Sequence, residues 1–72
     1  MAYVYTAGGY VIHAQGESRE ALTERIRAAG AQEVLELLAI GFTRDEEPFE
    51  EYVSVPVAQI AAVCARQLPP PD

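Results

Sequence analysis

The sequence predicts a small α+β protein, one domain of ββαββα order in which two helices cover one face of an antiparallel or mixed sheet. Two β-rich runs divided by a Gly-Gly pair, followed by an amphipathic helix, predict its first half. A second strand–strand–helix pattern predicts the rest. The 72 residues, half of them hydrophobic, are enough for one domain and too apolar for a disordered chain. We expect the domain to cover residues 1–68 and a proline-rich tail to cover 69–72.

The N-terminal hairpin is predicted from residues 2–6 and 10–14, which are rich in Tyr, Val and Ile and flank Gly8 and Gly9. The helix is predicted from about residue 18 to residue 30. Ser18 is a good N-cap, because its hydroxyl can accept a hydrogen bond from the first turn. Leu22 and Ile26 define the buried stripe, and Gly30 is placed to end the helix in a left-handed conformation.

The second half is less clear, because residues 32–42 fit either a helix or a strand. Their Leu, Glu and Ala content favours a helix, but the run is short and follows a helix that has just ended, so we interpret it as a strand. A further strand is expected at 51–55. Pro56 suits a first helical position, and Ile60, Val63, Cys64 and Leu68 then define one apolar side of a second helix.

Charge is distributed unevenly along the chain. Residues 1–30 carry three acids and three arginines, whereas residues 31–72 carry the whole net charge of −6, and lysine is absent. Phosphate backbones and anionic membrane surfaces would repel such a chain, so we expect neither direct nucleic-acid binding nor membrane binding. The favoured partner is a basic protein surface. A single cysteine excludes an internal disulfide and a multi-cysteine zinc site, and a cytoplasmic location is expected.

The stretch TRDEEPFEEY, residues 43–52, holds most of the excess negative charge. Two interpretations stay open: a solvated loop that keeps the protein soluble, and a surface that attracts Arg and Lys of a partner. Phe49 is either an anchor in that partner or a plug for the sheet edge. The predicted partner-binding residues are Asp45, Glu46, Glu47, Phe49, Glu50 and Glu51.

No metal or cofactor is expected. The acidic run lacks the spacing of a calcium loop, since Glu50 stands where the glycine of the sharp turn should be. Nor is an enzyme expected, because His13 and Cys64 have no local catalytic partners. Cys64 is more readily interpreted as a small buried hydrophobe. The hairpin tyrosines, Tyr3, Tyr5 and Tyr10, are instead candidates for a self-association surface in a homodimer.

Two resemblances bear on function. Residues 8–22 resemble the opening of HicB-type antitoxin domains, with Gly-Tyr on a strand and a Ser-x-Glu-Ala-Leu helix start. This resemblance implies a module that neutralises a toxin by binding it. The whole-chain profile is similar to small phage-encoded inhibitors such as anti-CRISPR proteins, which are compact, often acidic and without an active site. That resemblance implies a protein that blocks a nucleic-acid-binding site.

The sequence therefore predicts a non-enzymatic, cytoplasmic inhibitor that occupies a basic, nucleic-acid-binding surface of a partner, such as a bacterial defence complex. The alternative is a HicB-like antitoxin or dimeric regulatory module that binds its partner through the hydrophobic hairpin.

Overall fold

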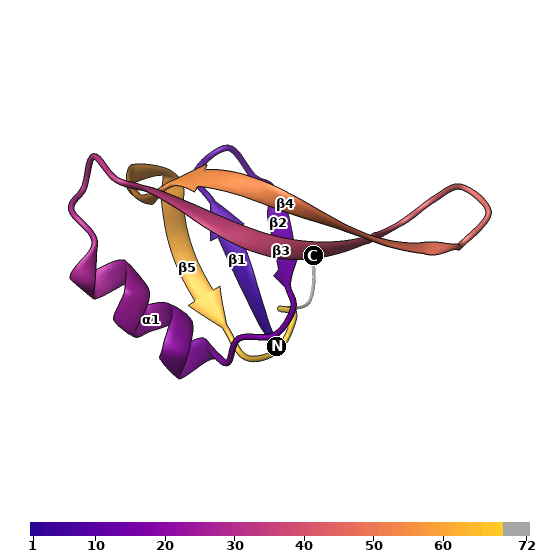
Figure 1. Cartoon of the computed structure of the whole chain (residues 1–72), viewed down its shortest axis with the longest axis horizontal. Coiled ribbons are helices and arrows are strands. Elements are labelled where there is room, and N and C mark those ends of the chain that lie inside the picture. The colour runs from indigo at the N-terminus through magenta and orange to yellow at the C-terminus, as the bar shows by residue number, and fades with distance from the viewer. Residues whose placement is uncertain (69–72) are drawn as a thin grey trace.

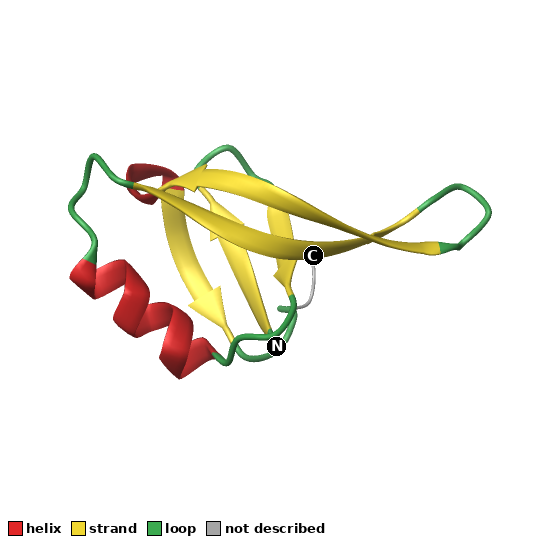
Figure 2. Ribbon diagram, in the orientation of Figure 1, coloured by secondary structure: helices red, strands yellow, loops and turns green. Residues whose placement is uncertain are grey.

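Five strands and one helix make up the protein in the computed structural model, which describes residues 1–68 (Figure 1). The strands, yellow in Figure 2, pair only in antiparallel fashion, and their order in the sheet of residues 1–68 is β4-β3-β2-β1-β5. The elements are β1 (Ala2–Thr6), β2 (Val11–Ala14), α1 (Arg19–Ala28), β3 (Val34–Phe42), β4 (Pro48–Pro56), a 3-10 turn η1 (Val57–Gln59) and β5 (Ile60–Cys64).

The core lies between α1, the β1–β2–β5 part of the sheet and the long β3–β4 hairpin. Its buried members are Ala2, Val4, Ala14, Leu22, Leu37 and Val55. Within the described residues, β2 and β3 share one register pair, Ala14 with Ala39, so the two parts of the sheet diverge beyond it. The hairpin can therefore turn its apolar face, carrying Leu37 and Val55, onto the same core as Val4.

The N-terminal hairpin is confirmed. β1 and β2 pair with Tyr3 opposite His13 and Val4 opposite Ile12. Val4 is buried, whereas Tyr3 is half-buried on the other face, as the alternation predicts. Gly9 has a positive φ of 90°, which glycine adopts without a steric penalty, and it allows the tight connection between the strands.

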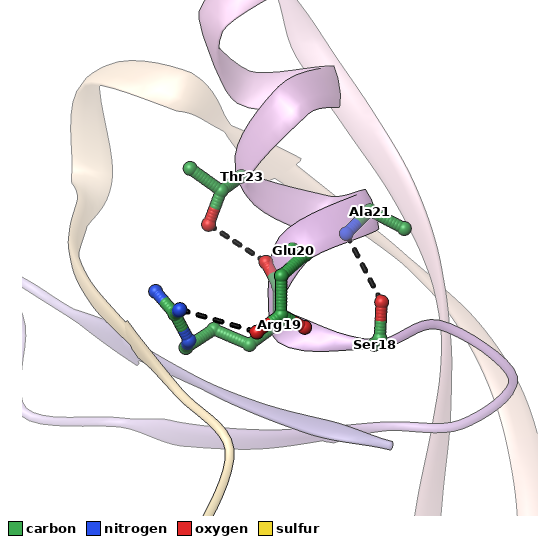
Figure 3. Close-up of polar contacts among 5 residues, drawn as sticks. All are labelled: Ser18, Arg19, Glu20, Ala21 and Thr23. Carbon is green, nitrogen blue, oxygen red and sulfur yellow. Dashed lines mark hydrogen bonds and ion pairs between the residues drawn. The ribbon is translucent and has the colours of Figure 1, made fainter.

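The helix is confirmed, and its start is shown in Figure 3. The Ser18 hydroxyl accepts a hydrogen bond from the Ala21 backbone N–H at 3.1 Å, which makes Ser18 the N-cap (Figure 3). The Glu20 carboxyl is hydrogen-bonded to the backbone of the same residue, and the positive charge of Arg19 is nearby. The first effect, and then the second, lowers the pKa of this carboxyl below its ordinary value. The predicted C-terminal cap is wrong: the helix ends with Ala29 as its C-cap, which has extended backbone, and Gly30 does not adopt the left-handed conformation.

The strand interpretation of residues 32–42 is also confirmed, with bounds Val34–Phe42. Leu35 and Leu37 are buried, while Glu36 between them is exposed. Tertiary packing overrides the helical propensity here, because the strand gains a nine-pair ladder with β4 and buries two leucines at once. β4 begins earlier than expected, at Pro48, and takes in half of the acidic stretch.

The predicted second helix is wrong. Residues 57–59 form a single 3-10 turn, and Ile60–Cys64 form β5, which pairs with β1 at the sheet edge. The register shifts by one residue between Tyr5 and Thr6, so Ala61 is extra and the side-chain alternation changes there. Ile60 and Val63 consequently pack against the same core. A β-bulge thus produces an i, i+3 apolar spacing that in the sequence alone predicts a helix.

The expected ββαββα architecture with two helices is therefore wrong: residues 1–68 form a mostly β fold of five antiparallel strands and one helix. The expected proline-rich tail, residues 69–72, lies outside the described residues. Within residues 1–68, no helix has the length and apolar character needed to cross a membrane.

Candidate interaction surface

The acidic stretch forms the far end of the β3–β4 hairpin. The two strands stay in one continuous register from Val34 opposite Pro56 to Phe42 opposite Pro48. The near half of this ladder packs on the core, and the far half projects away from the rest of the molecule (Figure 1). We call residues 41–51 the acidic arm. It contains all six residues predicted to bind a partner.

The tip of the acidic arm is a five-residue turn, 43–47. The Glu46 N–H donates to the Thr43 carbonyl oxygen, and the Thr43 N–H donates to the Glu47 carbonyl oxygen, each at 2.9 Å. The Thr43 hydroxyl also accepts a hydrogen bond from the Glu47 N–H at 3.2 Å. This pattern requires a left-handed residue at position 46, which is usually glycine in such hairpins, but Glu46 occupies it with φ 63°. The tip is thus held by backbone bonds at some conformational cost.

The carboxylates of the acidic arm are exposed and differ in direction. Asp45, Glu46 and Glu47 lie in the turn, whereas Glu50 and Glu51 are adjacent in β4 and therefore point to opposite faces of the hairpin. The arm thus presents negative charge on both faces rather than on one.

These carboxylates form no ion pair within residues 1–68. Three ion pairs are present among the described residues. Arg19–Glu20 and Arg27–Glu24 lie within α1, and Arg25–Glu17 joins α1 to the residue just before its N-cap. None of them involves the arm. Its charges are therefore available to a partner.

Phe49 has a structural contact as well as an exposed surface. Its ring lies on Gly41 of the facing strand, where an added Cβ would be 2.6 Å from the ring Cζ. Because Gly41 has no side chain, the ring can lie directly against its backbone and cover it. The side chain is still 44% exposed, so one side of it faces solvent. Both expectations for Phe49 thus apply in part: it seals its own hairpin and still offers apolar surface.

The hairpin tyrosines are not brought together as a single exposed cluster. Tyr3 stacks on His13 with ring centroids 4.4 Å apart, and the Tyr5 hydroxyl accepts a hydrogen bond from the Leu68 N–H at 2.7 Å. Both side chains are half-buried. Tyr10 lies in the connection before β2 and is 75% exposed. Two of the three proposed self-association residues therefore serve the fold directly.

Cys64 and His13 cannot act as a dyad in this arrangement. Cys64 lies in β5, not in a helix, and Tyr3 of β1 is the register partner of both Cys64 and His13. The two side chains are thus two strand spacings apart, or about 10 Å, which exceeds hydrogen-bond reach. The described residues also contain no cluster of His, Cys, Asp or Glu that could hold a metal ion.

The structure adds an apolar groove that the sequence did not reveal. It has a volume of about 420 Å³ and is lined by residues 10–12, by residues 53–56 of β4, and by Thr6, Gly8 and Gln59. Its walls come from segments more than 40 positions apart, so no local pattern could have located it. Tyr10 and Val11, which line the groove, are 75% and 45% exposed.

Comparisons with known proteins add no homologue: no protein-family model, no curated protein and no solved structure matches this chain.

Proposed function

We propose that this chain is a non-enzymatic binding protein that places its acidic arm against a basic surface of another protein. The observation that carries the proposal is the contrast in ion pairing between the helix and the arm. The acids Glu17, Glu20 and Glu24 each have an arginine partner, whereas none of the carboxylates at 45–51 has a salt bridge among the described residues. Opposite charge on a partner would steer its approach to the arm and fix its orientation.

The proposed partner surface is one that ordinarily binds nucleic acid in the cytoplasm. Arg and Lys gather most densely where a protein neutralises phosphates, and a projecting arm with carboxylates on both faces can enter such a groove. The particular function that we propose is inhibition of a nucleic-acid-binding complex, such as a bacterial defence complex, in the manner of small phage-encoded inhibitors. Size, net charge and the exposed arm support this assignment.

Affinity capture with matched variants tests the proposal. Tagged wild-type protein, a Glu50→Gln/Glu51→Gln variant and a Glu33→Gln/Glu36→Gln variant are incubated with bacterial lysate at low salt. Each variant removes two negative charges, but only the first removes them from the arm. We expect the wild type and the Glu33/Glu36 variant to retain the same nucleic-acid-binding complex. The Glu50/Glu51 variant should retain much less of it.

Two further properties identify the binding as electrostatic and competitive. Salt should release the complex, because screening weakens exposed charge pairs, and added duplex DNA should displace the protein from it. With the purified partner, neutralising Glu50 and Glu51 should slow association and flatten its salt dependence. Equal retention by all three baits, or no competition with DNA, would contradict the proposal and leave the arm as a solubilising feature.

A further inference from the structure

Within residues 1–68, β4 is an edge strand, and no strand pairs with its outer side. The β3–β4 ladder determines which backbone groups of β4 face outward. The Val57 N–H donates to the Glu33 carbonyl oxygen at one end, and the Thr43 N–H donates to the Glu47 carbonyl oxygen at the other. Because hydrogen-bonded pairs alternate along an antiparallel ladder, the odd-numbered residues of β4 bond to β3. The even-numbered residues direct their backbone groups outward.

The two prolines of β4 limit this edge. Pro48 and Pro56 are both even-numbered, so the N–H groups that they lack would have pointed outward and β3 loses no bond. The outward-facing donors of β4 are therefore the N–H groups of Glu50, Tyr52 and Ser54. A strand added at this edge would be short and held between two prolines.

The opposite edge of the sheet is less suitable. β5 has five residues against nine in β4, it carries the bulge at Ala61, and α1 packs near it. The β3–β4 ladder, in contrast, continues without a register shift from end to end. A long, regular edge strand is a template for pairing with another chain.

The apolar groove lies beside the same edge. Four consecutive residues of β4, 53–56, line it, although alternate side chains of a strand point to opposite faces. The groove therefore follows the backbone edge of β4 as well as one of its faces. A strand bound at the edge would lie next to the groove and could place side chains in it. The other half of β4 carries Glu50 and Glu51, so the edge is apolar towards Pro56 and acidic towards Pro48.

This polarity argues for a basic partner rather than a second copy. Each copy carries a net charge of −6, and pairing two β4 edges would bring four β4 glutamates into one small sheet. A segment with arginine or lysine opposite Glu50 and Glu51 has complementary charge instead. Antiparallel pairing is the more stable of the two orientations per residue.

We propose that a partner docks by adding a short antiparallel β-strand to the outer edge of β4, with apolar side chains in its N-terminal half and basic ones in its C-terminal half. The apolar half lies along the groove beside Val53 and Val55, and the basic half lies beside Glu50 and Glu51. Backbone hydrogen bonds to Glu50, Tyr52 and Ser54 hold the strand. This inference rests on the proposed function, because it specifies how the basic partner is recognised.

A designed peptide tests the inference with the full chain. The probe has nine residues, with valine at the second and fourth positions, arginine at the sixth and seventh, and threonine elsewhere. In antiparallel register its valines face Val55 and Val53 and its arginines face Glu51 and Glu50. One control peptide is N-methylated at the third, fifth and seventh residues, which face Ser54, Tyr52 and Glu50. It keeps every side chain and charge but loses the inter-strand N–H donors.

A second control peptide has the reversed sequence.

Binding is measured by fluorescence anisotropy and by backbone amide exchange in NMR. We expect N-methylation to weaken binding at least about tenfold, because the three inter-strand hydrogen bonds that the peptide donates are lost. Reversal should weaken it as well. The amides of Glu50, Tyr52 and Ser54 should gain protection on binding, whereas those of Glu51 and Val53 should already be protected. Binding by charge alone would not produce this alternation.

The outcomes separate this inference from the proposed function. Equal, salt-sensitive binding of the plain and N-methylated peptides would overturn strand addition and leave a basic partner in place. Absence of peptide binding at millimolar concentration would also overturn strand addition. It would not overturn the proposed function, which the lysate capture tests separately. Protection of the same three amides in the concentrated protein alone would identify a second copy as the occupant and overturn the basic partner.

Discussion

The two halves of the β3–β4 hairpin share one ladder but differ in what stabilises them. In the near half, Leu37 is 1% exposed and Val55 is 3% exposed, and both belong to the core. In the far half, Phe49 is 44% exposed and its contact is the facing Gly41. Backbone pairing is continuous through both halves. Continuous register thus extends an ordered strand pair beyond the core, where local cross-strand contacts and turn geometry must maintain it.

Truncating one leucine in the near half should give the largest effect. Leu37→Ala leaves a cavity in a core with few large buried side chains, and we expect a loss of about 3 kcal/mol in the free energy of unfolding. Ile40→Ala, in the far half at a half-buried position, should cost about 1 kcal/mol. Urea denaturation of both variants measures the difference. Equal losses in the free energy of unfolding would mean that the core does not stabilise the near half more than the far half.

The contact between Gly41 and Phe49 gives the next largest effect. Gly41→Ala places a methyl group 2.6 Å from the Phe49 ring, so the ring must move, and we expect a loss of about 1–2 kcal/mol. In a Phe49→Ala background the same substitution should cost clearly less, because the obstructing ring is absent. A double-mutant cycle by thermal or urea unfolding measures this coupling. Additive costs would show that Phe49 does not pack on Gly41.

The turn at the tip should give the smallest effect, and of opposite sign. Glu46 adopts φ 63°, which costs an L-residue roughly 1 kcal/mol and glycine almost nothing. Glu46→Gly should therefore raise the free energy of unfolding by up to about 0.5 kcal/mol, because the greater freedom of glycine in the unfolded chain offsets part of the relieved strain. Calorimetry should show a higher Tm. Asp45→Gly, one residue earlier and without a positive φ, is the control and should lower it.

Much of the first half of the chain could be predicted because its signals are local. The cap at Ser18, the stripe through Leu22 and Ile26, and the Gly-Gly connection each depend on neighbours within a few residues. The error at residues 57–68 had a specific cause. Ile60 and Val63 share a face through a bulge, and a bulge exists only relative to the partner strand β1, which lies more than 50 residues earlier. No local pattern distinguishes that spacing from a helical one.

The candidate site divides in the same way. The concentration of carboxylates at 45–51 is visible in the sequence, and so is the imbalance that leaves them without enough basic neighbours. Their direction is not visible, because the placement of Glu50 and Glu51 on opposite faces depends on β4 starting at Pro48 and pairing with β3. The groove was likewise beyond prediction, since residues 10–12 and 53–56 meet only in the folded chain.

Composition and local order by themselves determined that this protein is a small, acidic domain with a helix capped at Ser18, an N-terminal hairpin and a charged stretch at 43–52. Tertiary structure alone decided that residues 60–64 form an edge strand, that the charged stretch becomes a projecting arm, and that β4 offers an open edge beside an apolar groove. The physical reason is the range of the interactions. Caps and turns are satisfied within a few residues, whereas sheet order, bulges and grooves require partners that only the folded chain brings together.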